Sequence, residues 1–494
     1  MQLLFCGQGK GTMGVDKKYM PTIMVILVGT FVGSLTQTLL TSALPRIVAE
    51  LEVSVGLGQW FTTIYLLVIG IMVPTTSFLI GKFSTRQLFY TCMSLFFAGS
   101  LLALFSGNFM ILLMGRVLQA MGTGILFPLL NVIVLELAPL HRRGFAMGIV
   151  GLAVSFAPAI APTLSGWLND TYGWQSIFLL LSVFSGAILL CSVFLLKNVN
   201  REEASGTLDK TSILLSSCGF GGLLLAFTSL SDYGLVHLLV IVPLAVGILS
   251  LVFFVRRQLR IKNPLLDVRI FKNRDFAVGT ALISLYYFAF LGMGIVLPIY
   301  IQSYLGRTAF VSGLTLLPGA FLMAITSPIS GWMLDRLGAR ATLIIGSAFL
   351  TGGTLLLVMT NASTPMGVLV ADYCVRCIGL GFLIMPTTTW SVDSLDLKKI
   401  PDGVAVNNTM RQVMGAIGSA LMVTVMSAAI AGSDFDSPTR AGVYGVHMSF
   451  LFSAILCAAA LILAVIFVRG TKKETFKKDR RRTRHGGTNG RLFV

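Results

Sequence analysis

Long apolar stretches follow one another along nearly the whole chain, and short segments that carry the charges separate them. A membrane-spanning helix needs about 20 mostly apolar residues. Twelve stretches between successive charges are long enough. Two more are long enough if internal charges are accepted, about 109–138 with Arg116 and about 365–391 with Asp372 and Arg376. The pattern therefore predicts fourteen membrane-spanning helices. They are expected to begin near Tyr19, Leu57, Leu88, Phe109, Gly144, Trp174, Thr211, Leu235, Phe276, Ser312, Ala341, Pro365, Gly403 and Gly445.

Helices fit this pattern better than strands. The apolar runs are too long and too uniform for the alternation of a membrane β-barrel. Composition agrees, because apolar residues make up 55% of the chain and charged residues only 12%, against roughly 25% charged in an ordinary globular protein. So few charges cannot cover a surface that faces water. The sequence predicts an all-α integral membrane protein.

The distribution of lysine and arginine predicts the orientation, because the cytoplasmic loops of membrane proteins are enriched in these residues. With the N-terminus inside, cytoplasmic segments hold 31 of the 37 lysines and arginines, and only Arg46, Arg307 and Arg440 fall outside. We therefore expect a multi-pass protein of the plasma membrane with both termini in the cytoplasm. The net charge of +17 then reflects orientation rather than nucleic-acid binding. The basic tail from Lys472 to Arg484 is either a solvated tail or a site for anionic lipids.

Residue patterns that would mark an enzyme or a metal site do not occur in the predicted spans. Cys374 and Cys377 form a CxxC pair, but no second pair lies nearby in the sequence, which favours helix packing over metal binding. The four histidines fall in or near loops, and no arrangement of Ser, His and Asp joins the spans. No nucleotide-binding loop of the Walker type is present. We expect no catalytic residues, no cofactor and no metal.

Polar residues in the first predicted span fall on one stripe. Their spacings of three and four place them on one helix face. A polar face toward lipid is costly, so the stripe should face other helices or water. Two interpretations stay open, namely hydrogen bonds between helices and a wall of a transport cavity. The residues are Ser34, Gln37, Thr38, Thr41 and Ser42.

Charged residues inside spans are candidates for function, because an unpaired charge in the bilayer is expensive. Arg116 is one such residue. Asp372 and Arg376 are four apart, the spacing of an ion pair on one helix face. A structural pair and a role in coupling are both open for them. Arg411 is predicted to be a structural or gating anchor.

Aromatic residues in two spans could offer a surface to lipophilic cations, with packing or lipid contact as the alternative. They are Tyr65, Tyr286, Tyr287 and Phe290.

A short turn that contains glycine and arginine occurs twice. One copy reads GKFSTRQLF from Gly81, and the other reads GWMLDRLGAR from Gly331, so that Arg86 and Arg336 coincide. Internal duplication is a sign of transporters built as two halves about a central pathway.

A second pattern lies between residues 157 and 168, where Ala157, Ala161 and Ser165 are four apart and so are Pro158 and Pro162. The small residues predict a tight packing face, and the prolines free backbone carbonyls and bend the helix.

The repeated turn resembles the loop signature of the major facilitator superfamily. Four other segments resemble further motifs of that family, namely TSALP from Thr41, GRVLQAMGTG from Gly115, APAIAPTLSGWL from Ala157 and GVAVNNTMRQVMGAIGSAL from Gly403. With fourteen spans, the chain is similar to the drug:proton antiporter branch, and especially to multidrug exporters of the lincomycin-resistance type. The likeness covers about residues 17–468.

The resemblance implies two six-helix halves with two helices inserted between them. The expected domains are an N-terminal segment (1–18), the first half (19–196), the inserted pair with a basic loop (197–274), the second half (275–468) and a basic tail (469–494). The implied activity is export of amphiphilic drugs or antibiotics by proton antiport and alternating access, with the proton gradient as energy source. The alternatives are an exporter or flippase of an endogenous lipid or metabolite, and a polytopic membrane enzyme.

The expected partners are a small amphiphilic substrate, protons and the bilayer; we expect a monomer that binds no nucleic acid. The candidate pathway residues are Gln37, Thr41, Tyr65, Arg116 and Tyr287. The candidate coupling or gating residues are Asp335, Arg336, Asp372, Arg376, Arg411, Pro158 and Pro162.

The chain departs from the family pattern in three places. Ala161 and Ser165 replace glycines that are usual in the antiporter motif. The acid that the family often carries in the first span is replaced here by Gln37, which cannot exchange a proton. Thr85 of the first turn stands where the second turn has Asp335, so the charge relay of the first turn is incomplete. Asp335 is expected to act as a gate together with Arg336. Our hypothesis is that Asp372 carries or shares the coupling proton.

Overall fold

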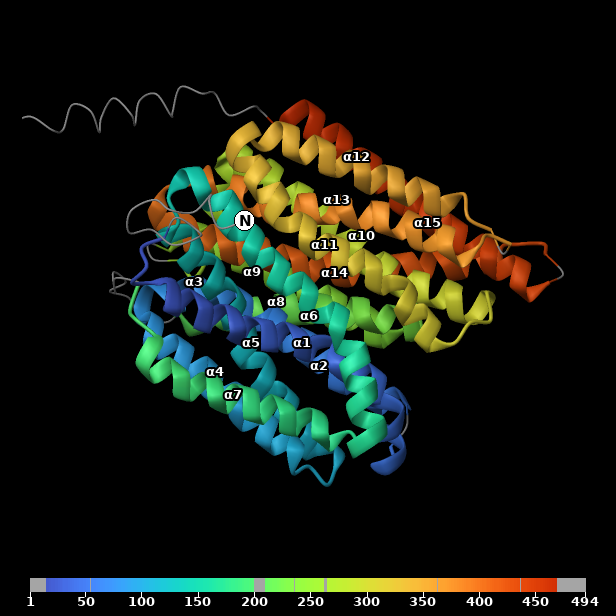
Figure 1. The fold of residues 1–494 in the computed structure, drawn as a ribbon, viewed down its shortest axis with the longest axis horizontal. Coiled ribbons are helices and arrows are strands. Elements are labelled where there is room, and N and C mark those ends of the chain that lie inside the picture. Colours follow the sequence, from blue (N-terminus) through green and yellow to red (C-terminus); the bar gives the residue numbers. More distant parts are fainter. Residues whose placement is uncertain are drawn as a thin grey trace, which may run out of the picture.

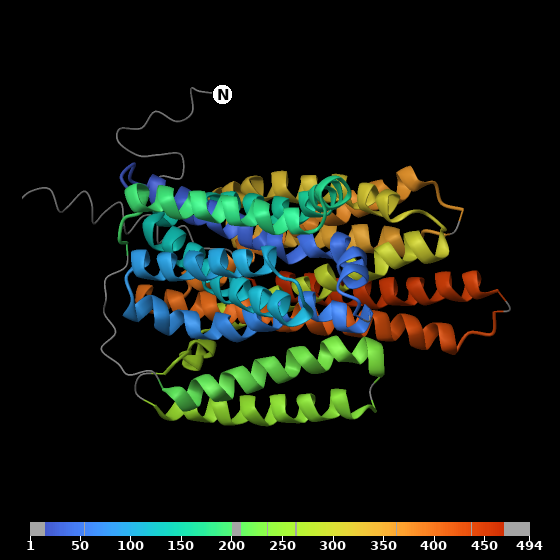
Figure 2. The same cartoon turned by 90° about the horizontal axis from the view of Figure 1, so that it is seen from below.

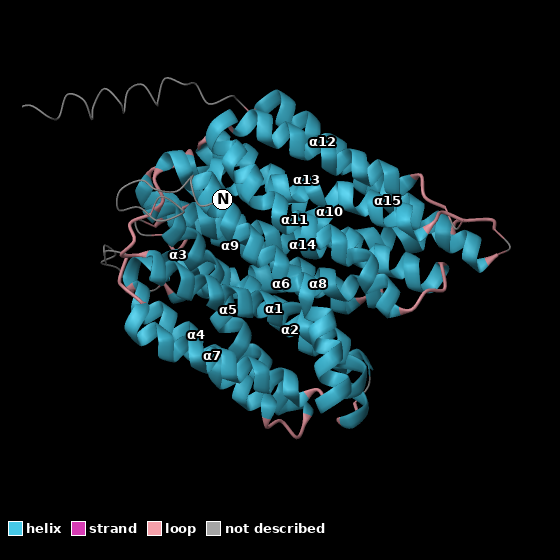
Figure 3. Cartoon of the chain, viewed as in Figure 1, coloured by secondary structure: helices cyan, strands magenta, loops and turns pink. Residues whose placement is uncertain are grey.

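The computed structural model describes residues 15–53, 55–199, 209–234, 236–261, 264–361, 363–435 and 437–468. No β-strand occurs in these ranges, and the regular structure is helical throughout (Figure 3). The α-helices, labelled in Figure 1, are α1 (Met20–Glu50), α2 (Val55–Met72), α3 (Thr76–Lys82), α4 (Thr85–Leu104), α5 (Phe109–Leu137), α6 (Arg143–Tyr172), α7 (Gln175–Leu195), α8 (Lys210–Tyr233), α9 (Leu238–Arg260), α10 (Arg274–Ile299), α11 (Ala309–Leu337), α12 (Ala339–Val358), α13 (Met366–Asp393), α14 (Ile400–Ala431) and α15 (Pro438–Phe467). Short 3₁₀ turns η1 (Val73–Thr75), η2 (Leu140–Arg142), η3 (Val268–Lys272) and η5 (Leu397–Lys399), and a π-helical turn η4 (Tyr300–Tyr304), complete the set.

Fourteen helical stretches of the described residues are long and apolar enough to cross a membrane, which confirms the predicted number. The largest difference in position is at the last span, which was expected to begin near Gly445, whereas α15 begins at Pro438. The seven additional residues include polar Thr439 and Arg440, so hydropathy alone did not indicate them. Proline suits the first turn of a helix, because the N–H that it lacks would have no partner there.

The second span is built from three segments, α2, η1 and α3. Pro74 lies in η1 and has no N–H to donate, so the α-helical ladder is interrupted there. The backbone adapts through a 3₁₀ turn and then continues as α3.

The helices form two groups with an additional pair. Helices α1 to α7 are called the first half and α10 to α15 the second half. Most contacts of these helices lie within a half, but α6 packs most extensively against α11, and α3 against α14. Helices α8 and α9 pack against each other, and α8 contacts α2 of the first half and α14 of the second. Figure 2 shows this pair along one side of the bundle. The residue limits expected for the domains remain a prediction.

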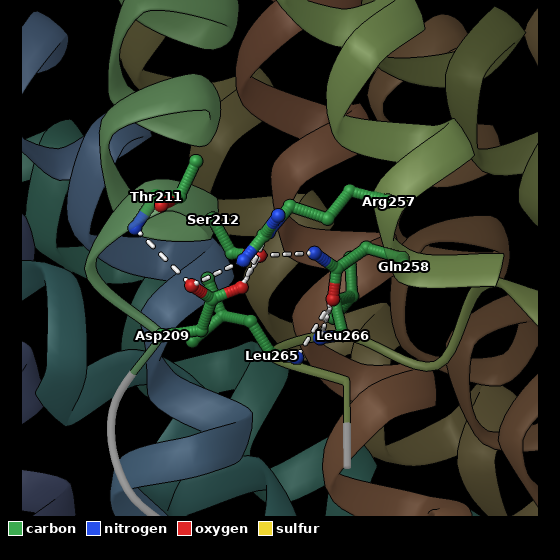
Figure 4. Close-up of polar contacts among 7 residues, drawn as sticks. All are labelled: Asp209, Thr211, Ser212, Arg257, Gln258, Leu265 and Leu266. Atoms are coloured by element: carbon green, nitrogen blue, oxygen red, sulfur yellow. Dashed lines mark hydrogen bonds and ion pairs between the residues drawn. The ribbon is translucent and has the colours of Figure 1, made fainter. Parts of the chain in front are cut away.

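A polar cluster fastens α8 to α9 at one end (Figure 4). The Asp209 carboxylate pairs with the Arg257 guanidinium, with Nε–Oδ2 and Nη2–Oδ1 distances of 2.7 and 3.0 Å, and it accepts a hydrogen bond from the Thr211 N–H at 3.2 Å. Beside it, the Gln258 amide donates to Ser212 Oγ at 2.6 Å. Hydrogen bonding from Arg257 holds the pKa of Asp209 at about 2. The inserted pair is therefore fixed as one unit at this end.

Candidate functional site

The two halves meet most closely at one end of the bundle. This end carries the turns α3–α4, α5–α6, α9–α10 and α11–α12, lies at the left in Figures 1 and 2, and is called the basic end below. Lys82, Arg142, Arg336 and Lys399 lie there. Three separate polar contacts join the halves at the basic end.

The first contact is a carboxylate at a helix start. Asp335, near the end of α11, accepts hydrogen bonds from the N–H groups of Gly144 and Phe145 at 2.9 and 2.8 Å. These donors belong to the first turn of α6, where backbone N–H groups have no partner within the helix and the helix dipole favours negative charge. Asp335 of the second half thereby holds α6 of the first half. Arg336, the other turn residue, is exposed and lies over the Trp332 ring at 4.8 Å.

The second contact lies beside the first. Arg143 Nη1 and Asp393 Oδ1 form an ion pair at 2.6 Å between α6 and the last residue of α13. The backbones approach closely here, since a Cβ added to Gly331 would lie 2.0 Å from the Gly144 carbonyl oxygen. Only glycine fits that position without movement of α6. The second copy of the repeated turn thus places its glycine at a point of contact between the halves.

The third contact joins α3 to α14. Ser77 Oγ donates to Asp402 Oδ1 at 2.5 Å, and the same oxygen accepts from the Asp267 N–H at 3.3 Å. Asp267 in turn pairs with Lys399 at 3.3 Å. The segment between α9 and α10 is therefore tied to the first turn of α14, where the two halves meet.

Helices α6 and α11 separate toward the opposite end. Their close approaches involve Gly148 and Gly151 of α6, which face Ser327 of α11. Farther along, the Phe156 and Phe321 rings meet edge to face with centroids 5.1 Å apart. A Cβ added to Gly166 or Gly313, nearer the opposite end, would find no atom of the described residues within 4 Å. The structure is therefore closed at the basic end.

Arg116 lies fully buried on α5 of the first half. Its Nε donates to the Phe61 carbonyl at 3.0 Å, and its Nη1 donates to Gln119 Oε1 at 3.0 Å. A weaker contact of 3.5 Å reaches the Thr36 carbonyl, and the guanidinium lies 4.1 Å from the centre of the Tyr65 ring. Carbonyls, an amide and a ring surround this charge, and none of the ion pairs among the described residues includes it.

The ion pair expected between Asp372 and Arg376 is not formed among the described residues. Arg376 is 1% exposed and its Nη2 donates to the Ala289 carbonyl of α10 at 2.6 Å. Asp372, one turn nearer the start of α13, is only partly buried. The spacing of the two residues permits an ion pair. The pair is absent from the described part of the chain because burial of the Asp372 carboxylate beside Arg376 would cost the hydration energy of that carboxylate.

Arg411 lies at the boundary between the halves. It is 3% exposed on α14; its Nη1 donates to Asn408 Oδ1 at 3.1 Å and its Nη2 contacts Thr388 Oγ1. Its guanidinium lies 5.1 Å from the Tyr287 ring centre and 6.0 Å from that of Phe127, which belongs to α5 of the first half. This position agrees with an anchor between the halves.

The remaining predicted residues are distributed as follows. Gln37 on α1 is partly buried, and so is Pro158 on α6. The side chains of Thr41 and Pro162 lie outside the part that the structure describes. Ala157, Ala161 and Ser165 are 0% exposed, which confirms the packing face predicted for them.

Sequence reasoning missed several residues of the basic end. The missed residues lie near helix termini, where the sequence pattern marks a charged or polar residue only as the edge of a span. They are Ser77, Arg143, Asp393 and Asp402. A usable signal was present, because two acids flank the same turn between α13 and α14. Their partners in the first half could not be inferred from local sequence.

Comparison with known proteins shows the family of the chain. Residues 26–419 match the family model described as Major Facilitator Superfamily. An uncharacterized MFS-type transporter YcnB of Bacillus subtilis is 40% identical, with 89% of this chain and 93% of that protein covered. The lincomycin resistance protein LmrB of Listeria monocytogenes is 36% identical over 94% of this chain and 100% of its own. The human organic anion transporter MFSD10 shares the fold with a TM-score of 0.66 and 15% identity, over 90% of this chain and 99% of that one.

Proposed function

Because this chain belongs to the major facilitator superfamily, we propose that it exports amphiphilic drugs or antibiotics across the cytoplasmic membrane in exchange for protons. The observation that carries the proposal is its likeness, over nearly the full length of both chains, to a relative named for lincomycin resistance. The fold and the relatives are those of transporters, which argues against a membrane enzyme.

In the proposed cycle, the basic end faces the cytoplasm and both termini lie inside. The contacts of Asp335, Asp393 and Asp402 close this side while the opposite side is open to the exterior. Export then requires these contacts to break, so that substrate enters from the cytoplasm or the inner leaflet. Alternating access of this kind is expected of a protein built as two repeated halves.

For proton coupling, we retain Asp372 as the proposed carrier. Its carboxylate is partly exposed near the start of α13, and no ion pair of the described residues includes it. A carboxylate without a fixed cationic partner can be protonated and deprotonated as access to water changes. Gln37, which takes the place of the acid often found in the first span, has no such capacity.

Everted membrane vesicles test this proposal. After respiration acidifies their interior, a panel of amphiphilic drugs should release protons from wild-type vesicles, as reported by a pH-sensitive dye. The Asp372→Asn variant should lose the drug-induced proton release and still bind drug, whereas Asp434→Asn, in an exposed loop, should behave as wild type. Drug transport without any proton movement would contradict antiport. Proton release that survives Asp372→Asn would contradict the assignment of the carrier.

A further inference from the structure

Three arginines lie deep within the spans without a carboxylate partner. Arg116, Arg376 and Arg411 are 1%, 1% and 3% exposed. None of the ion pairs among the described residues includes any of them. A buried charge is costly in the bilayer unless it is solvated or used. The interior of the bundle therefore carries positive charge that no carboxylate of an ion pair balances.

The aromatic rings that could attract a cationic drug already face these arginines. The Arg116 guanidinium lies 4.1 Å from the Tyr65 ring centre, and the Arg411 guanidinium lies 5.1 Å from that of Tyr287. A second cation near the same ring would be repelled by the first, and this repulsion is strong where the dielectric constant is low. Tyr65 and Tyr287 are thus poorly suited to bind a lipophilic cation.

The Arg411 region also has hydrogen-bonding capacity that the described residues do not use. Arg411 Nε and Asn408 Nδ2 are buried and have no hydrogen-bond partner among these residues. The same holds for both amide atoms of Asn131, a residue that is 0% exposed. Buried polar atoms without partners are rare in folded proteins and need a physical explanation, of which a bound water, ion or ligand group is one.

Asn131 belongs to this region because of its place on α5. It follows Phe127 by four residues, so the two share a helix face, and the Phe127 ring lies beside the Arg411 guanidinium. Arg411 itself is 11 residues past the start of α14 at Ile400, about 16 Å along the helix at 1.5 Å per residue. That depth is near the middle of a hydrocarbon core about 30 Å thick.

We infer that Arg411, Asn408 and Asn131 form a site for an anionic group, a carboxylate or another oxyanion, on the transported amphiphile. Guanidinium and amide N–H groups are the donors that such a group needs. The site draws on α5 of the first half and α14 of the second, so the ligand contacts both halves. This inference rests on the proposed export function and specifies its substrate class as acidic rather than cationic.

The test uses three probes that share a pyrenebutyl body and carry head groups of different charge: pyrenebutanoate, its methyl ester and pyrenebutyl trimethylammonium. Binding to the purified protein is measured by fluorescence anisotropy, and transport is measured separately in proteoliposomes. The wild type should bind the acid at least roughly tenfold more tightly than the ester or the cation, the scale of one charge-assisted hydrogen bond. Arg411→Gln should remove this preference, and Arg411→Lys should keep part of it.

Asn131→Leu is a second variant. It breaks no hydrogen bond among the described residues, because the Asn131 side chain has no hydrogen-bond partner there. It should weaken binding of the acid severalfold and leave the ester unchanged. Arg440→Gln, at an exposed arginine near the start of α15, is the matched control and should change neither.

Two results overturn the inference: equal or tighter binding of the cation by the wild type, or an acid preference that survives both Arg411→Gln and Asn131→Leu. A protein that binds the acid selectively and transports none of the probes would contradict the export function while confirming the site. Binding therefore tests the anionic site, and transport tests the export function separately.

Discussion

At the α11–α12 turn, Asp335 reaches the opposite half and accepts two backbone hydrogen bonds from α6. At the α3–α4 turn, Thr85 has the same place in the repeat, and its hydroxyl accepts a hydrogen bond at 3.3 Å from the N–H of Val199, in the segment that follows α7. The first half contacts α14 through Ser77, which donates to Asp402. The two turns share a sequence pattern but differ in their role between the halves.

This difference extends to the whole basic end. The carboxylates of its three contacts, Asp335, Asp393 and Asp402, all belong to the second half. The donors are backbone N–H groups of α6, the Arg143 guanidinium and the Ser77 hydroxyl, all from the first half. Closure of this end therefore depends on acids of one half and donors of the other, although the fold is duplicated.

Replacement of each turn residue by alanine should give the largest difference between the two turns. Asp335→Ala removes two hydrogen bonds to a charged acceptor, which contribute about 1.5–3 kcal/mol each. Export should fall at least roughly tenfold, because that loss shifts the halves away from the closed state. Thr85→Ala is the matched control, and export should stay within about twofold, because the hydrogen bond of the buried Thr85 hydroxyl with Val199 does not join the two halves. Initial export rates per amount of membrane protein measure both, and equal losses would contradict the asymmetry.

A second prediction concerns the glycine of the turn. Gly331→Ala places a methyl group against the Gly144 carbonyl, and overpacking of this kind costs about 1–3 kcal/mol. Export should fall about tenfold, and cysteine labels should enter more readily from the basic end. Gly352 of α12 is the control position. The methyl group of Gly352→Ala would have no described atom within 4 Å, so this variant should leave export unchanged. An effect of Gly352→Ala as large as that of Gly331→Ala would show that helix propensity, not contact between the halves, is responsible.

The Arg143–Asp393 ion pair should have a smaller effect, because Asp393 is 28% exposed. Arg143→Gln and Asp393→Asn should each reduce export severalfold. The double variant should be no worse than the more affected single variant, because the second change removes a partner that is already lost. Fully additive losses in this cycle would mean that the two side chains act independently.

The smallest effect is expected at the cluster that joins α8 to α9, because this cluster does not join the two halves. Asp209→Asn should leave export within about twofold and lower the melting temperature slightly, as for a partly exposed ion pair. The pKa of Asp209 in the folded protein is about 2, below the ordinary value of about 3.9. The contribution of ionised Asp209 to the free energy of unfolding is therefore complete at neutral pH, and it is lost as the pH falls from about 4 to about 2. Melting curves should show the gap between variant and wild type closing over that range; a gap that widens in acid would contradict the ion pair.

Hydropathy was enough to predict the fourteen spans, because the bilayer requires a long apolar run for each helix. The repeat was enough to single out Asp335, which accepts two hydrogen bonds from α6, whereas its role as a gate stays a prediction. Tertiary contacts could not be predicted in this way. The spacing of Asp372 and Arg376 suggested an ion pair, yet Arg376 donates to the Ala289 carbonyl on another helix.

The partners of Arg411 were equally inaccessible. Phe127 lies nearly three hundred residues earlier in the sequence and belongs to the other half. A local pattern describes one helix face at a time, whereas these contacts depend on which faces meet after the helices assemble.

In the proposed cycle, the two ends of α6 and α11 open and close in opposition. Spin labels at exposed Leu140 and Leu337 report the basic end, and labels at exposed Tyr172 and Phe310 report the opposite end of the same helices. Pulsed electron–electron distance measurements in proteoliposomes, with and without drug and across a pH step, compare the two pairs. We expect the Leu140–Leu337 distance to lengthen in the same conditions in which the Tyr172–Phe310 distance shortens. Two distances that lengthen together, or a basic end that never opens, would contradict it.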